Sequence, residues 1–262
     1  MMRALNTSGT GMVAQQYNLD VIANNLANVN TTGFKAQRAE FQDLMYQTYR
    51  AAGAPSGTGQ TQPVSLQVGL GTRFSSTVSD FAPGAMNQTG NPTDMAINGQ
   101  GFFKVLRPDG SYGYTRDGSF STDTNGLLVN ADGMPLQPEI TLPAGAGSIT
   151  ISSDGVISAL KAGESTVTEI GKLTITMFTN PGGLSRVGQN MYTATSASGT
   201  PVDTIPGQNG SGSILQSFTE GSNVQVVTEM ERMISAQRAY EINSKAISTA
   251  DDMLSMLDQL KR

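Results

Sequence analysis

The sequence predicts an α+β protein in which a mainly β central domain is inserted between long N- and C-terminal helices. Three features predict this class. Residues 222–261 contain no Gly and no Pro, and apolar residues recur in them at helical spacing. Residues 1–34 carry a second row of this kind. Between the two, Asp-Gly and Asn-Gly dipeptides stand seven or eight residues apart, which is typical of short antiparallel strands joined by tight turns.

The C-terminal helix is predicted from a heptad series. One row, with a residue at every seventh position, consists of Val226, Met233, Tyr240, Ile247 and Leu254. A second row, three positions further on, contains Ala236, Ala250 and Leu257, and Glu229 and Asn243 are polar breaks in it. Ser222 and Gln225 indicate a capping box at the start. At about 1.5 Å per residue the helix is about 55 Å long, more than a compact domain of this size is wide, so it needs a partner.

The N-terminal helix offers such a partner. Its apolar row consists of Leu5, Met12, Leu19 and Leu26, and Ile22 and Val29 lie three positions after the last two. Residues 1–34 carry only Arg3 and Asp20 as charged side chains, so this helix is expected to face protein nearly all round. The two helices are therefore expected to pair as a coiled-coil-like domain; the alternative is that both lie on one globular domain.

Intrinsic propensity makes this helix the weaker of the two. Gly9 and Gly11 each cost about 1 kcal/mol relative to Ala, and five Asn residues between 18 and 30 favour local side-chain bonds to the backbone. Gly33 is predicted to end the helix as a left-handed cap. The segment 36–50 is expected to form a short helix or an extended arm, and the uncharged Gly- and Pro-containing segment 51–63 a loop.

The central domain is predicted from its turns. These are Asp109-Gly110, Asp117-Gly118, Asn125-Gly126 and Asp132-Gly133. Strands are expected at 112–115, 119–121, 127–129, 148–151, 155–159, 171–178 and 191–194.

Composition excludes several classes of function. The chain of 262 residues has a net charge of −5 and no basic run, so nucleic acid and anionic membranes are unlikely partners. It shows neither an apolar stretch that would insert in a membrane nor a secretory signal pattern. Without His or Cys, serine- and cysteine-based triads and zinc–thiolate sites are excluded.

Carboxylates are the remaining candidates for chemistry. Asp117 with Asp123 or Glu139 would suit a glycosidase, and Asp123-Thr-Asn-Gly126 is similar to half of a calcium loop. However, Asp before Gly in a turn ordinarily bonds the backbone, and the glutamate that would complete a calcium loop is absent. The sequence therefore predicts no enzyme, no catalytic residue, no cofactor and no metal.

Four motifs carry a resemblance to a known family. The run Val21-Ile-Ala-Asn-Asn-Leu-Ala-Asn-Val-Asn-Thr-Thr-Gly-Phe-Lys35 resembles the N-terminal signature of bacterial flagellar rod and hook proteins, and Gln237-Arg-Ala-Tyr-Glu-Ile-Asn-Ser-Lys-Ala246 the matching C-terminal motif. Gly99-Gln-Gly-Phe-Phe-Lys-Val105 and Tyr114-Thr-Arg-Asp-Gly-Ser-Phe120 resemble central motifs of the same axial protein family. The likeness covers essentially the whole chain and is greatest to the distal-rod members.

The resemblance implies a division of labour along the chain. Residues 1–34 and 222–262 would form the helical axial domain, 35–70 a connecting arm and 71–221 a β-rich outer domain. In distal-rod members a segment at about 46–63, absent from hook proteins, wedges between neighbouring subunits and stiffens the tube.

The resemblance also implies the setting. The chain would form a straight, hollow homopolymer, the periplasm-spanning drive shaft of the basal body. Its partners would be proximal-rod proteins, the hook protein or hook junction, the P-ring and L-ring bushing, and the type III export apparatus, which exports without a cleaved signal peptide.

We therefore interpret the chain as a structural subunit that polymerises through its helices. The alternatives are a hook or proximal-rod subunit of the same family and, in another class, a secreted β-rich binding module; absent Trp and the long apolar seams argue against the latter. The candidate interface residues are Leu5, Met12, Leu19, Ile22, Leu26, Val226, Met233, Tyr240, Ile247, Leu254 and Leu257.

Overall fold

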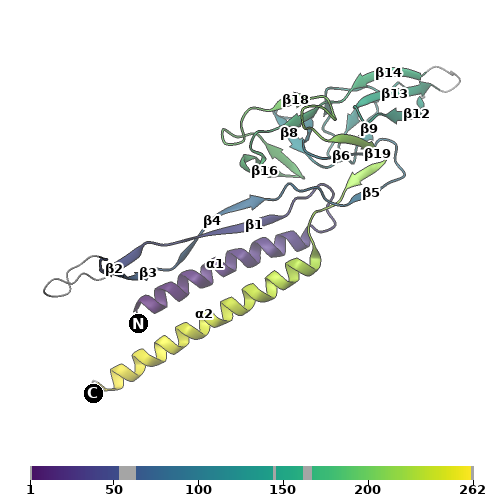
Figure 1. The fold of residues 1–262 in the computed structure, drawn as a ribbon. Helices are drawn as coiled ribbons and strands as arrows, with labels where there is room; N and C mark the ends of the chain where they lie inside the picture. Colours follow the sequence, from purple (N-terminus) through teal and green to yellow (C-terminus); the bar gives the residue numbers. More distant parts are fainter. Residues whose placement is uncertain (1, 53–62, 144–145, 162–166, 261–262) are drawn as a thin grey trace. The chain divides into compact units, whose positions relative to one another are not determined.

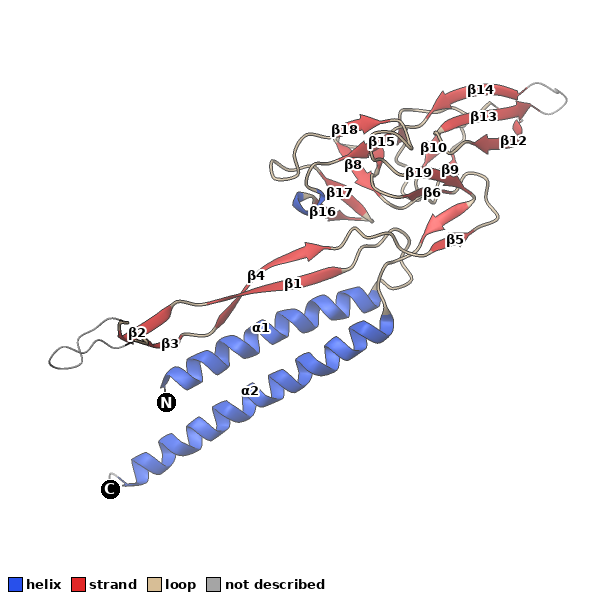
Figure 2. Cartoon of the chain, viewed as in Figure 1, coloured by secondary structure: helices blue, strands red, loops and turns tan. Residues whose placement is uncertain are grey.

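The chain has a helix near each end and many short strands between them (Figures 1 and 2). The computed structural model describes residues 2–52, 63–143, 146–161 and 167–260. This arrangement confirms the predicted α+β class. Neither of the two long helices in the described part is apolar enough over a sufficient length to cross a membrane.

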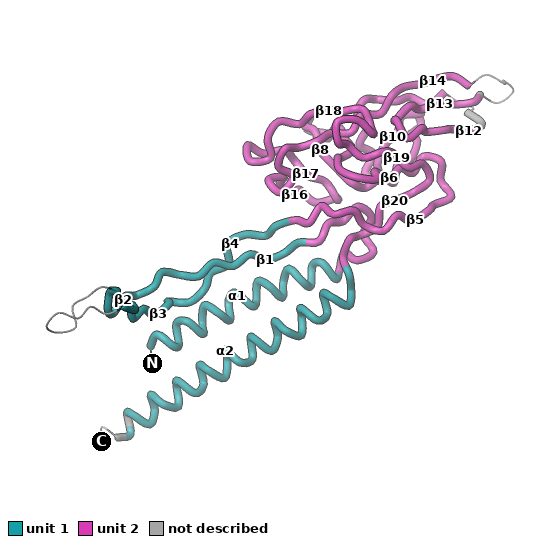
Figure 3. Tube along the Cα trace, viewed as in Figure 1, with its two compact units in different colours: residues 1–26, 37–78, 225–262 teal, residues 27–36, 79–224 magenta. Residues whose placement is uncertain are grey.

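The chain divides into two compact units, which are coloured separately in Figure 3. Unit 1 contains Met1–Leu26, Gln37–Val78 and Gln225–Arg262, and unit 2 contains Ala27–Ala36 and Ser79–Val224. The sequence-based division set residues 35–70 apart as a connecting arm. In the structure most of this segment belongs to the same unit as the two helices.

In the residues that the structure describes, unit 1 consists of two helices and two ribbons of two strands each. The helices are α1 (Met2–Ala27) and α2 (Val226–Leu260). One ribbon pairs β1 (Gln37–Asp43) with β4 (Thr72–Ser79), and the other pairs β2 (Tyr46–Arg50) with β3 (Leu66–Gly69). The segment 36–50 is thus an extended arm, and the alternative of a short helix is wrong. Residues 53–62, most of the predicted loop, lie outside the described part.

The start of α2 differs from the prediction. Ser222 does not cap the helix: its Oγ accepts a hydrogen bond from the backbone N–H of Val224 at 3.3 Å. The first intrahelical bond runs from the N–H of Glu229 to the carbonyl of Gln225 at 3.0 Å, so Gln225 occupies the N-cap position. The predicted capping box is therefore wrong, because the residues before Gln225 are held in unit 2.

The end of α1 is also earlier than predicted. The helix ends at Ala27, so Gly33 does not cap it, although its φ of +68° is the predicted left-handed conformation. Gly33 donates its N–H to the carbonyl of Glu220 at 2.7 Å, and a Cβ on it would lie 2.5 Å from the backbone nitrogen of Asp117. Glycine is thus required here by a close approach of two chain segments within unit 2.

Unit 2 is built from antiparallel sheets. The largest has the order β11–β7–β8–β17–β16, formed by Leu136–Gln137, Phe103–Leu106, Tyr112–Thr115, Met191–Thr193 and Ser185–Gly188. A second has the order β12–β13–β14, formed by Ala146–Ile151, Val156–Lys161 and Val167–Lys172. Four pairs complete the described sheets: β9 (Ser121–Thr122) with β10 (Leu128–Val129), β15 (Ile175–Met177) with β18 (Val202–Thr204), β6 (Met95–Asn98) with β19 (Ser213–Gln216), and β5 (Met86–Gln88) with β20 (Phe218–Glu220). A short 3-10 helix, η1 (Pro181–Gly183), precedes β16.

The core of unit 2 lies between these sheets. Its central side chains are fully buried and include Ile97, Phe103, Ile157, Ile175 and Ile214. A second, aromatic cluster consists of Phe102, Tyr114, Phe178 and Tyr192. These two clusters give unit 2 the hydrophobic interior that a body of this size needs to be stable.

The turn prediction holds at three of four dipeptides. Gly110, Gly126 and Gly133 have φ of 79°, 80° and 79° and lie in the turns that join β7 to β8, β9 to β10, and β10 to β11. Gly118 is different: its carbonyl accepts the N–H of Met95 at 2.9 Å, and a Cβ on it would lie 1.5 Å from the Met95 oxygen. This dipeptide therefore marks a close backbone contact rather than a hairpin. The strand predicted over 171–178 is divided between β14 and β15.

Candidate assembly surface

The two helices of unit 1 run antiparallel, and two contacts fix their register. Asn25 Nδ2 donates to Glu229 Oε2 at 3.2 Å. Fourteen residues away along each helix, the Asn243 side chain lies against Gly11. A Cβ on Gly11 would come within 3.0 Å of the Asn243 Nδ2 atom. The residue numbers of both pairs add to 254, so the two contacts describe one antiparallel register.

Asn25 joins three elements of unit 1. Its Nδ2 also donates to the carbonyl of Gln37 at 2.8 Å, and its Oδ1 accepts the N–H of Gln37 at 2.9 Å, so one amide satisfies both backbone groups at the start of β1. Glu229 in turn accepts from Arg232 Nη1 at 2.7 Å. Asn25 is 0% exposed and Glu229 is 4% exposed. Sequence reasoning treated Glu229 as a break in the seam, but it is a contact of the helix pair.

A ribbon of strands packs on another side of α1. The Tyr17 ring stacks on Phe74 of β4 with centroids 4.9 Å apart, and Phe41 of β1 meets Phe74 edge-on at 6.1 Å. The Arg3 guanidinium lies 4.9 Å from the centre of the Tyr49 ring in β2. The packing of these strands against α1 accounts for part of the low charge of the helix. No sequence pattern indicates this packing, because aromatic residues in a strand and in a helix do not reveal their partners.

The predicted interface residues of α1 are partly or fully buried. Leu5, Met12, Leu19 and Leu26 are half-buried, and Ile22 is buried. An open groove of about 690 Å³ runs between this helix and the ribbon and is lined by Leu5 together with Val13, Leu44 and Phe74.

The predicted interface residues of α2 are more exposed. Met233, Ile247 and Leu254 are half-buried, whereas Val226, Tyr240 and Leu257 are exposed. The row three positions further on lies deeper, at Glu229, Ala236, Asn243 and Ala250. The side of α2 that meets α1 is thus made of small and polar residues, and the larger apolar residues lie beside it.

The C-terminal end of α2 extends beyond the described part of α1. In the observed register Met2, the first described residue of α1, is level with Asp252. The described part of α2 continues for eight more residues, about 12 Å at the helical rise. Met253, Met256 and Leu257 are exposed on this overhang. No residue of α1 that the structure describes is level with them.

Further apolar side chains are exposed along the rest of α2. Val227 is 71% exposed and Ile242 is 66% exposed, and Met230 and Ile234 are about half exposed. Single exposed apolar residues are common on proteins, but a series of them on one helix is typical of a surface that another protein covers.

The carboxylates considered for catalysis bind neighbouring groups. Asp117 Oδ1 accepts the N–H of Ser119 at 3.0 Å, and the Asp123 carboxylate accepts from Thr124 Oγ1 at 3.3 Å and from Asn125 Nδ2 at 3.4 Å. Glu139 is exposed and lies 3.3 Å from the Gln137 amide. These carboxylates thus have the turn contacts expected of structural residues.

A cavity of about 430 Å³ in unit 2 is lined by Phe81, Phe102, Phe178 and Arg116. Arg116 donates to two backbone carbonyls and lies against Glu220, so it is engaged in structural contacts. Among the residues that the structure describes, no three or more acidic side chains come together as a metal site would require.

Comparisons with known proteins agree with this geometry. Three family models match: "Flagella basal body rod protein" at residues 5–35, "Flagellar hook protein FlgE/F/G D1 domain" at 96–159 and "Flagellar basal body rod FlgEFG protein C-terminal" at 215–260. The first covers most of α1, the third α2, and the second the strands of unit 2 from β6 to β13.

Curated relatives cover the whole chain. The flagellar basal-body rod protein FlgG of Borreliella burgdorferi is 50% identical over 264 residues, which is 100% of both chains. FlgG of Buchnera aphidicola subsp. Acyrthosiphon pisum is 50% identical over 99% of this chain and 100% of its own. FlgF of Caulobacter vibrioides is 34% identical over 92% and 91%. The chain therefore belongs to the flagellar basal-body rod protein family, the axial family to which FlgG belongs.

Proposed function

We propose that this chain is a structural subunit of the flagellar distal rod. It polymerises through unit 1 into a straight, rigid, hollow tube, which spans the periplasm and transmits motor torque to the hook. The identity to FlgG, at 50%, exceeds that to FlgF, at 34%, and this supports placing the chain with FlgG.

The observation that carries this proposal is the unpaired apolar surface of α2. Met253, Met256 and Leu257 project from a helix end that passes beyond the described part of α1, and Val227 and Ile242 are also exposed. A second copy of the chain can cover such a surface through a heterologous contact, in which two different patches meet. When the rotation between copies does not close into a ring, such contacts repeat along a screw axis and build a helical polymer. Leu5, Met12, Leu19 and the other predicted seam residues are the proposed interface positions.

Torsional stiffness follows from the packing of many such helices. Twisting the tube requires packed side chains to slide past one another, and close-packed interfaces resist this displacement. The exposed ribbon of β2 and β3 adds a second contact. Tyr46, Tyr49, Leu66 and Val68 are all exposed on it. The segment at about 46–63 is proposed to wedge between neighbouring subunits in the assembled tube; β2 is its described part, and residues 53–62 lie outside the described residues.

The further partners follow from the position of a distal rod. They are proximal-rod proteins at one end, the hook or hook junction at the other, the P-ring and L-ring bushing around it, and the type III export apparatus that delivers the subunits. The chain is proposed to have no enzymatic activity and no cofactor. The local contacts of the Asp117 and Asp123 carboxylates support this.

Negative-stain microscopy of the purified protein at rising concentration tests the proposal. Straight tubes above a critical concentration are expected. Globular particles at every concentration, under conditions where the protein is folded and pure, would contradict it and favour a binding module.

A pair of variants locates the contact. Met256→Asp replaces an exposed apolar side chain of the overhang with a charge, and Gln259→Asp adds the same charge at an exposed polar position three residues away. Met256→Asp is expected to abolish tubes or raise the critical concentration at least tenfold, and Gln259→Asp to leave it within about threefold. If the two variants had the same critical concentration for tube formation, an apolar contact at Met256 would be excluded.

A further inference from the structure

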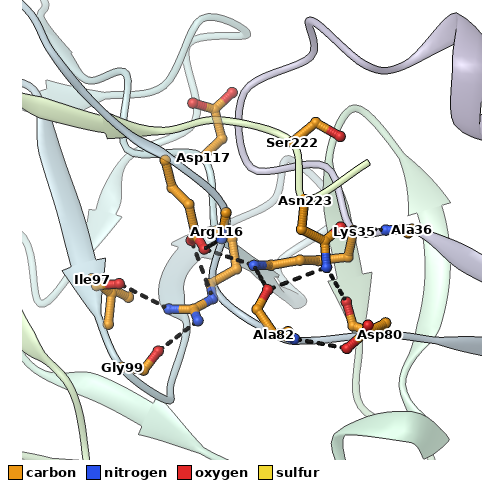
Figure 4. A network of polar contacts seen from close by, with 12 residues as sticks. Lys35, Ala36, Asp80, Ala82, Ile97, Gly99, Arg116, Asp117, Ser222 and Asn223 are labelled. Carbon is orange, nitrogen blue, oxygen red and sulfur yellow. Dashed lines mark hydrogen bonds and ion pairs between the residues drawn. The ribbon is translucent and has the colours of Figure 1, made fainter. Parts of the chain in front are cut away.

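Three buried charged side chains meet in unit 2. Those of Lys35, Arg116 and Glu220 are 0%, 2% and 0% exposed. Lys35 Nζ lies 2.6 Å from Glu220 Oε1, and Arg116 Nε lies 3.5 Å from Glu220 Oε2; Lys35 and Arg116 are labelled in Figure 4. Two cations thus share one carboxylate. Burial lowers the pKa of both Lys35 and Arg116, and the charge of Glu220 opposes this effect.

Bonds of these side chains and of the backbone beside them link three separate stretches. Lys35 Nζ donates to the carbonyl of Ala82 at 2.7 Å, and Glu220 Oε1 accepts the N–H of Gly84 at 2.9 Å. The carbonyl of Glu220 accepts the N–H of Gly33 at 2.7 Å. Residues 33–36, 79–84 and 220–224 are therefore tied to one another through this network.

Neighbouring polar side chains repeat the same ties. Asn223 Oδ1 accepts the N–H of Ala36 at 2.7 Å, and its Nδ2 donates to the carbonyls of Asp80 at 2.9 Å and Ala82 at 3.2 Å (Figure 4). Arg186 of β16 donates to the carbonyl of Lys35.

Arg116 connects the network to the strands of unit 2. It follows β8 directly, and its guanidinium donates to the carbonyl of Gly99 at 2.6 Å and to that of Ile97, in β6, at 3.4 Å (Figure 4). The three tied stretches are thus anchored to the body of the unit.

These stretches share one property in the sequence. Each contains the last or first residues of unit 2 before the chain passes to unit 1, at Ala36, Ser79 and Val224. We propose that Lys35, Arg116, Glu220 and Asn223 form a boundary clamp, which holds the three stretches as one rigid body so that a load arriving along one is shared by the others. The mechanical part of this inference rests on the proposed function.

The chemistry of the clamp supports a role in positioning. Apolar side chains of the same volume often stabilise a protein as well as a buried ion network or better, because removing charges from water is costly. Hydrogen bonds to backbone groups fix direction as well as distance, which apolar packing does not. This network is buried despite the free-energy cost of removing charges from water, and its hydrogen bonds are directed at the three points where the chain passes from one unit to the other. Such a network is suited to holding these three points in place.

Hydrogen exchange on the full-length monomer, below the concentration at which tubes form, tests the clamp. Glu220→Gln keeps the shape and removes the charge; Glu169→Gln makes the same change at an exposed ion pair with Lys172 in the same unit. Glu220→Gln is expected to speed exchange at least tenfold in all three stretches while β7 and β8 keep their protection. Glu169→Gln is expected to leave all of them unchanged.

Other outcomes overturn the inference. If Glu220→Gln affects Gly84 alone, the stretches are not held as one body. If it unfolds the whole unit, Asn223→Ala decides, because this half-buried residue touches the same three stretches without carrying charge. Faster exchange confined to the residues that Asn223 bonds directly would then exclude a clamp.

The mechanical part has its own measurement. Tubes formed by Asn223→Ala are expected to be more curved in micrographs than wild-type tubes. Equal straightness, together with faster exchange in the monomer, would show a clamp that carries no load. Failure of the wild-type chain to form tubes would contradict the proposed function and leave the exchange result standing.

Discussion

Replacing Asn25 with alanine removes the amide that joins α1, β1 and α2. The change deletes its bonds to the N–H and carbonyl of Gln37 and to Glu229. A polar group left unpaired in the interior costs about 1–3 kcal/mol. Because Gln37 is only half-buried, water can reach it. The low end of that range applied to two or three groups gives about 2–3 kcal/mol. The gain in helix propensity, about 0.5 kcal/mol, reduces the expected loss to about 2 kcal/mol.

The critical concentration for tube formation measures this loss. Since about 1.4 kcal/mol corresponds to a factor of ten, Asn25→Ala is expected to raise the critical concentration by about 30-fold. The melting temperature of unit 2 is expected to stay unchanged, because Asn25 belongs to unit 1. Asn18→Ala is the matched control: Asn18 lies on the same helix and makes a long bond of 3.5 Å to Gln15. Its critical concentration should stay within about threefold of the wild type.

Asn25→Asp makes the same test dependent on pH. The new carboxylate still accepts the N–H of Gln37, but it faces the Gln37 carbonyl and the Glu229 carboxylate, to both of which Asn25 donates. Two adjacent carboxylates repel when both are ionised, so the defect should be largest near pH 7 and shrink as pH falls toward 4. A critical concentration equal to that of the wild type in both variants would refute the reasoning that Asn25 holds the helix pair.

Four further predictions follow from named features. Deleting residues 46–63 should leave unit 2 folded and give curved tubes in micrographs; equally straight tubes would exclude a wedge. Gly33→Ala should lower the melting temperature of unit 2 by more than Gly133→Ala, since both have positive φ but only Gly33 has backbone within 3 Å of the new Cβ. Because burial lowers the pKa of Lys35 below 10.5, the folded state binds fewer protons there than the unfolded state. The stability of unit 2 should therefore rise with pH up to about 10.5, and less steeply in Lys35→Met, in chemical denaturation at several pH values. Residues 2–27 and 226–260, the helices α1 and α2, should be largely disordered in dilute monomer and helical in tubes; strong amide protection across α2 without polymer would contradict this.

The sequence predicted the elements whose signal is local. The absence of Gly and Pro after Ser222, together with the heptad rows, predicted α2, and three Asp-Gly or Asn-Gly dipeptides predicted their turns. These features depend on a residue and its immediate neighbours, and φ > 0 at Gly110 is a property of one residue.

The elements that were missed depend on contacts far apart in the sequence. Ser222 and Gln225 have the letters of a capping box, but Asn223 between them bonds Ala36 and holds the chain out of the helix. Gly118 lies in a turn-like dipeptide, yet its backbone meets Met95 of another strand. No local pattern records such partners.

The heptad pattern predicted the helix pair, but the structure places a different row of α2 against α1. Val226, Tyr240 and Leu257 are exposed, while Glu229 and Asn243, taken as breaks, contact α1. The heptad positions of Glu229 and Asn243, both in the second row, were the signal that could have identified them as contacts. The prediction gave more weight to hydrophobicity, because a polar residue in the seam of a coiled coil usually weakens the packing.

This assignment of rows bears on how assembly is controlled. The side of α2 toward α1 presents Ala236, Ala250 and two polar residues, and small side chains remove little apolar area from water on pairing. Pairing within one chain therefore has a weak hydrophobic drive, and its register depends on directional contacts such as Asn25 with Glu229. The larger apolar side chains, among them Met256 and Ile242, stay available to neighbouring copies. A helix pair built in this way gains most of its burial when subunits join, so that folding of the helices and growth of the tube are expected to be one coupled step.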